Sequence, residues 1–75
     1  MNQKEAEAKK LQYEKYIGQT YILKGDFTNT IHTIDAVIVR CVLGENCSVF
    51  FSLHNNQPTP FHENVDTFFE RFTRA

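Results

Sequence analysis

Residues 34–53, IDAVIVRCVLGENCSVFFSL, decide the predicted fold of this 75-residue chain. Two runs rich in Val, Ile, Phe and Leu flank Gly44-Glu45-Asn46, the strongest turn signal in the sequence. Two apolar runs around such a turn predict a β-hairpin. The other segments are expected to extend this hairpin or to cover it.

The length of the hairpin loop determines which side chains face each other. A two-residue loop pairs Val39 with Phe50 and mixes serines among the valines. A three-residue loop over Gly44-Glu45-Asn46, with Asn46 in the left-handed conformation, instead gathers only apolar side chains on one face. Its pairs are Leu43 with Cys47, Cys41 with Val49, Val39 with Phe51, and Val37 with Leu53. We therefore favour the three-residue loop.

The opposite face of the predicted hairpin is half polar, yet Ile38, Val42 and Phe50 make it too apolar to contact only water. Arg40 is expected opposite Phe50, where a cation–π contact is worth about 0.5–1 kcal/mol. A helix of the same chain is the favoured cover for this face, and a partner is the alternative.

Composition limits the class of protein. Residues 1–75 make a single domain, near the size at which one core is only marginally sufficient, so oligomerisation would help. A formal net charge of −1 argues against a dedicated binder of nucleic acid or anionic membranes. The first residues, MNQKEAEAKK, are charged throughout and do not resemble a signal peptide, so a cytoplasmic location is expected.

The two cysteines are expected to be buried free thiols. In the favoured register Cys41 and Cys47 share a face but lie diagonally, about 7 Å or more apart, which is too far for a disulfide. Free thiols are consistent with a reducing compartment.

Helices are predicted at both ends of the chain, over residues 2–17 and 64–74. Asn2 suits the start of the first helix and Gly18 suits its end. The apolar residues of this helix lie mostly in its second half, so its first two turns are expected to project. The second helix has apolar residues at helical spacing, which must be buried: Val65, Phe68, Phe69 and Phe72.

Residues 20–54 are predicted to be strands. Residues 20–24 form a short strand, Phe27 is expected under the sheet, and residues 28–33 are either a separate strand or the start of the hairpin's first strand. If they are continuous with it, that strand is long and bent and serves two sheets, as in small barrels. Residues 55–60, NNQPTP, form a loop. The result is an α+β fold with an antiparallel sheet of three to five strands.

No set of residues indicates catalysis. There is no glycine-rich phosphate loop, and cysteines within a strand ladder are inert. The possible metal ligands occur at none of the short spacings of metal sites: His32, His54, His62, Cys41 and Cys47. We therefore expect no enzyme, no cofactor and no metal.

A short strand, a long bent strand, a tight hairpin and a final helical turn together resemble the small SH3-like barrels. The segment VDTFFERF, residues 65–72, is similar to the aromatic and acidic ending of some short bacterial SH3-like proteins of uncharacterised function. This resemblance covers about residues 16–74 and implies a binding module. Small size without a catalytic set also resembles phage-encoded inhibitors of host defence, which bind a protein or trap a nucleotide.

These observations predict a non-enzymatic module for protein–protein interaction, acting as a homo-oligomer. Its surface would be the face with Ile38, Arg40 and Phe50, or the surroundings of the proline loop. The alternative is a small-ligand or nucleotide trap, in which Arg40, His54 and Asp35 line a pocket between subunits. Weak binding of single-stranded nucleic acid, through lysines and tyrosines near the first helix, is a third reading.

Overall fold

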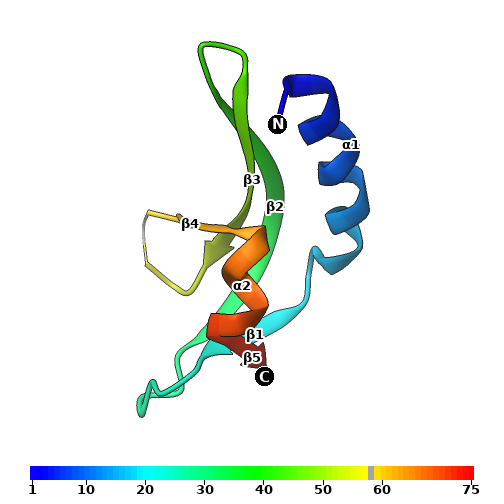
Figure 1. The fold of residues 1–75 in the computed structure, drawn as a ribbon. Helices are drawn as coiled ribbons and strands as arrows, with labels where there is room; N and C mark the ends of the chain where they lie inside the picture. The colour runs from blue at the N-terminus through cyan, green and yellow to red at the C-terminus, as the bar shows by residue number, and fades with distance from the viewer. Residues whose placement is uncertain (58) are drawn as a thin grey trace.

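The computed structural model describes residues 1–57 and 59–75 and shows an α+β fold (Figure 1). Its elements in chain order are α1 (Gln3–Tyr13), the 3-10 helix η1 (Glu14–Tyr16), β1 (Thr20–Leu23), β2 (Ile31–Val42), β3 (Asn46–His54), β4 (Phe61–Asn64), α2 (Val65–Arg71) and β5 (Phe72–Arg74). The strands form one antiparallel sheet in the order β4-β3-β2-β1-β5, which confirms the predicted class. In the described part of the chain this sheet is open between β4 and β5. Among these residues, no helix is long and apolar enough to cross a membrane.

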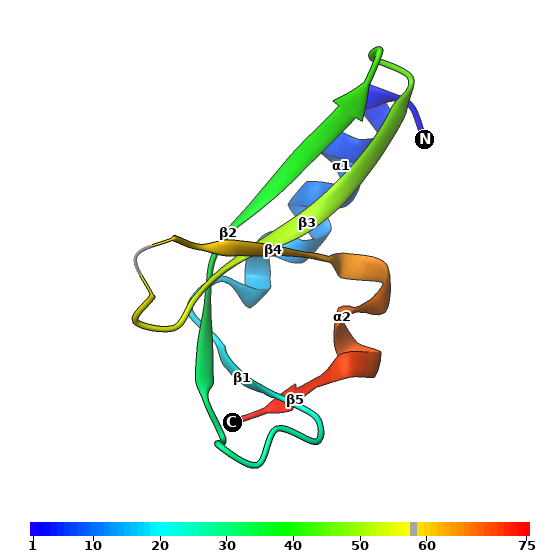
Figure 2. The ribbon, with the colours of Figure 1, turned by 90° about the vertical axis from the view of Figure 1, so that its left-hand side faces the viewer.

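Strand β2 joins the two parts of the sheet. Residues 31–33 pair with β1, whereas most of the strand pairs with β3 to form a long hairpin (Figure 2). A β-bulge between Ile34 and Ala36 leaves Asp35 as the extra residue. The bulge shifts the alternation of side chains, so Ile34 before it and Val37 after it are both buried. Of the two alternatives that the sequence left open, the structure shows the continuous strand, which starts at Ile31 and belongs to one sheet rather than two.

The hairpin register differs from the predicted one by two residues. Cys41 lies opposite Cys47, not Val49, and the loop covers residues 43–45. Leu43 and Gly44, with φ of 55° and 74°, take the left-handed conformations assigned to Asn46, as a tight hairpin turn requires. Because a shift of two residues leaves every side chain on the same face, the predicted faces are correct although the predicted pairs are wrong.

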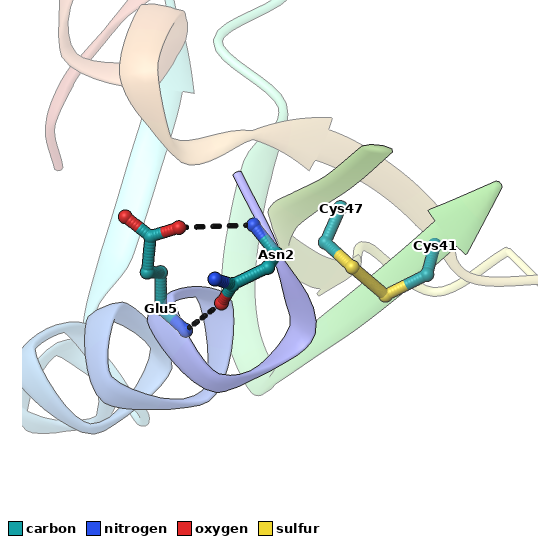
Figure 3. Close-up of a disulfide and its surroundings, with 4 residues drawn as sticks. All are labelled: Asn2, Glu5, Cys41 and Cys47. Carbon is teal, nitrogen blue, oxygen red and sulfur yellow. Dashed lines mark hydrogen bonds between the residues drawn. A yellow bond between two sulfur atoms is a disulfide. The ribbon is translucent and has the colours of Figure 1, made fainter. Parts of the chain in front are cut away.

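The corrected register makes a disulfide possible. Cys41 and Cys47 are directly opposite, with Cα atoms 3.9 Å apart, and their sulfurs are bonded (Figure 3). The prediction of two free thiols is therefore wrong, because it rested on a diagonal placement. The argument from free thiols to a reducing compartment no longer applies.

Helix α1 packs along the hairpin from its first turn. Asn2 and Glu5 form a capping box, in which the Asn2 side chain accepts from the Glu5 N–H at 2.8 Å and the Glu5 side chain accepts from the Asn2 N–H at 3.1 Å (Figure 3). Ala6 is fully buried, and the carbonyl of Met1 accepts a hydrogen bond from the Cys47 N–H at 2.8 Å. The first turns therefore do not project as predicted, because a small side chain at position 6 lets the helix approach the strands closely.

The C-terminal helix ends earlier than predicted, at Arg71. Phe72 is extended and begins β5, which pairs with β1. Its ring stays in the core, stacked on Phe68 with centroids 4.5 Å apart. The free edge of β1 thus pairs with residues that the helical spacing had assigned to the helix. Phe27 also differs from its prediction, because it is 92% exposed.

His32 is buried where the two ends of the sheet approach each other. It is 6% exposed, and its ring meets Phe61 of β4 and Phe72 of β5 edge-on, at centroid distances of 5.1 and 5.6 Å. Its Nδ1 atom has no hydrogen-bond partner among the described residues. Burial lowers the pKa of His32 below its ordinary 6.5, while the charges of Asp26 and Glu63 oppose this shift.

We expect reduction of the disulfide to lower the free energy of unfolding by about 2 kcal/mol, because the bond restricts the unfolded chain. Urea unfolding with and without a dithiol measures this difference. The Cys41→Ser/Cys47→Ser double variant is the control and should not respond to the dithiol. An equal response of both proteins would contradict the bond.

Stability should fall with decreasing pH below about 6.5, where the unfolded chain protonates His32 and the folded chain resists it. The slope attributable to one histidine cannot exceed about 1.4 kcal/mol per pH unit. Urea unfolding between about pH 7 and pH 5 measures it, and His32→Phe should flatten the profile. An unchanged slope in that variant would show that another group is responsible.

Candidate binding face

The hairpin face opposite the helices carries three of the five predicted site residues, Ile38, Arg40 and Phe50. We call it the outer face and define it by Ile38, Arg40, Phe50 and His62. Ile38 pairs directly with Phe50, and β4 adds His62 beside this pair. The three strands thus bring side chains from separate parts of the sequence onto one surface.

Both helices lie on the other side of the hairpin. Tyr13 of α1 and Phe68 of α2 each meet the ring of Phe51, which points away from the outer face. Figure 2 shows α1 behind β2 and β3, with no described helix in front of them. The prediction that a helix covers the outer face is therefore wrong. Both helices pack on the fully apolar face of the hairpin. Ile38 and Phe50, on the opposite face, are half-buried.

Arg40 is held by two neighbours on this face. Its guanidinium carbon lies 5.4 Å from the centre of the Phe50 ring, which confirms the predicted cation–π contact. The contact is diagonal, because the residue opposite Arg40 is Ser48. The guanidinium also donates a hydrogen bond to His62 Nδ1. Arg40 is therefore oriented over an apolar surface although the residue as a whole is exposed.

The other two predicted residues lie elsewhere. His54 ends β3 opposite Thr33, and Asp35 forms the bulge in β2. His54 is six residue steps along β3, or about 20 Å, from Ser48, the partner of Arg40. Arg40 and His54 therefore do not meet within one protomer. The part of the chain that the structure describes encloses no pocket and contains no group of three or more potential metal ligands.

His62 is the residue that sequence reasoning missed on this face. It was considered only as a metal ligand beside the proline loop, because Pro58 and Pro60 obscure the short strand that follows them. Pro58 itself lies outside the described residues. The alternation in Phe61-His62-Glu63 is the only local signal, and three residues are too few to assign a strand.

Comparisons with protein-family models, with curated proteins and with solved structures find no match. The chemistry of the outer face itself therefore carries the functional argument.

A double-mutant cycle should show that Arg40 and Phe50 are coupled. We expect Arg40→Gln and Phe50→Leu together to cost less than the sum of the single changes, by about 0.5–1 kcal/mol, since either change removes the same cation–π contact. Urea unfolding of the four proteins gives the coupling energy. Additive changes would contradict a stabilising contact.

Proposed function

We propose that this protein is a non-enzymatic module that binds another protein through its outer face and acts as a homo-oligomer. The observation that carries the proposal is the half-buried pair of Ile38 and Phe50 on a face that no described helix covers, next to an oriented arginine. Aromatic and arginine side chains that gather on one sheet face are groups that are enriched at protein interfaces.

The charge of the outer face supports a partner of defined chemistry. Arg40 has no carboxylate within ion-pair distance among the described residues, because the two ion pairs there are Lys9–Asp66 and Arg71–Glu63. A guanidinium whose neighbours are a ring and an imidazole can still donate to an acceptor from outside. The partner should therefore present an apolar side chain beside a carboxylate.

The likeness to small SH3-like barrels belongs to the same proposal. The long β2 strand, shared by both parts of the sheet, supports this likeness, whereas the open end between β4 and β5 differs from a closed barrel. Such folds are used mainly as binding modules, so the likeness favours binding over catalysis without identifying a partner.

Site-specific photocrosslinking tests the outer face. A benzophenone side chain at Ser48, beside Arg40, should capture a partner protein from an extract of the source cells. The same group at Phe27, which is exposed on a distant loop, is the matched control and should not capture that protein. Phe50→Asp should abolish the Ser48 crosslink with an unchanged circular dichroism spectrum, because a buried carboxylate at the interface is unfavourable.

Two results would contradict the proposal. Identical crosslinks from both positions would remove the outer face as the binding surface. A rise of several degrees in melting temperature with one member of a nucleotide panel would favour the ligand trap, because a ligand that binds only the folded state stabilises it.

A further inference from the structure

Residues 36–42 of β2, the part nearer the hairpin turn, form a free edge of the sheet. Strand β1 pairs only with residues 31–33 of β2, so residues 36–42 have a described strand neighbour on one side only, which is β3. Figure 2 shows this side of the hairpin without another element next to it. We call residues 36–42 the β2 edge.

The direction of the backbone groups along this edge follows from the disulfide pair. The Cys47 N–H donates to Met1, so it points away from β2, and Cys41–Cys47 is a pair without mutual hydrogen bonds. The N–H and C=O groups of Cys41 therefore point away from β3. With the two-residue period of a strand, those of Val39 and Val37 do the same. Within the described residues these groups have no backbone partner outside β2.

The β2 edge lacks the usual protection of a free strand. Natural edges are blocked by charged side chains, especially lysine, by proline, by bulges or by a covering element. The one charge on this edge, Arg40, contacts Phe50 and His62 on the side of β3 and β4. Here the only described bulge lies at Asp35, just before the edge begins, and the sequence of the edge, AVIVRCV, contains neither proline nor lysine. Val42 is 64% exposed on it. Such an edge is suited to accept a further strand.

A second copy of this chain can pair along the whole β2 edge when the pair is centred on Val39, the middle residue of the edge. In an antiparallel pair centred on Val39, Val39 faces its own copy and Val37 faces Cys41, which satisfies the outward backbone groups of all three residues. Moving the centre to Arg40 would place two arginines opposite each other. Centring on Val39 instead places Arg40 opposite Ile38 and Ala36 opposite Val42, so that no charge faces its like.

We propose that two copies of the protein pair antiparallel through the β2 edge, about a two-fold axis at Val39. The proposal rests on the homo-oligomer of the proposed function and names its surface, but it does not depend on a partner at the outer face. Side chains opposite each other in a sheet point to the same side. The dimer therefore has both outer faces on one side of a continuous sheet.

Sedimentation equilibrium on the whole chain tests the pairing. The wild type should have twice the chain mass of 8.8 kDa. Ala36→Lys/Val42→Lys places like charges opposite each other twice and should raise the dissociation constant of the dimer by about tenfold or more. The matched variant Ala36→Glu/Val42→Lys carries the same number of changes but places opposite charges together, so it should dimerise as the wild type does. Circular dichroism confirms that both variants are folded.

Two outcomes would overturn this pairing. A wild-type mass of 8.8 kDa at millimolar concentration would exclude the dimer altogether. Equal dimerisation of the two double variants would keep a homo-oligomer but place its interface elsewhere. The crosslinking result at Ser48 is independent of both outcomes, so a failure of the edge and a failure of the outer face can be told apart.

Discussion

The burial of the Phe51 ring is the contact on which the rest of the structure depends. The ring is fully buried and meets Tyr13 of α1, Tyr16 of η1, and Phe68 and Phe69 of α2, at centroid distances between 4.9 and 6.0 Å. One strand residue thus joins both ends of the chain to the hairpin. Because aromatic rings bury much apolar area and prefer edge-on contacts, this cluster fixes the helices on one face.

That arrangement makes the two faces of the hairpin contribute differently to stability. Side chains on the helix-covered face contribute roughly 1.5–3 kcal/mol each when fully buried, whereas those on the outer face remain partly in contact with water. The exposed ion pairs Lys9–Asp66 and Arg71–Glu63 add little by comparison. Changes on the outer face should therefore cost less free energy of folding than changes at a core residue such as Phe51.

Features of the fold that depend on neighbouring residues could be predicted from the sequence, whereas features that depend on distant contacts could not. The cap at Asn2 and the two faces of the hairpin depend on neighbouring residues or on a period of two, so sequence reasoning identified them. The continuity of β2 remained one of two alternatives. The disulfide was missed because Cys41 and Cys47 are opposite each other only in the observed register. The predicted register, shifted by two residues, puts the same side chains on each face, so the pattern of apolar residues could not distinguish the two. Strand β5 was missed because Phe72 is buried in either conformation, and the choice depends on a distant edge at β1.

The pairing of β5 with β1 also has a kinetic consequence. Tyr21 pairs with Arg74 across most of the chain, whereas the hairpin pairs, such as Val39 with Val49, are local. Local pairs form early and distant pairs form late, because closing a long loop costs more chain entropy. We therefore expect the hairpin to act as the folding nucleus and β5 to join last. Backbone amides of residues 72–74 should then exchange with solvent through an opening that leaves the hairpin intact.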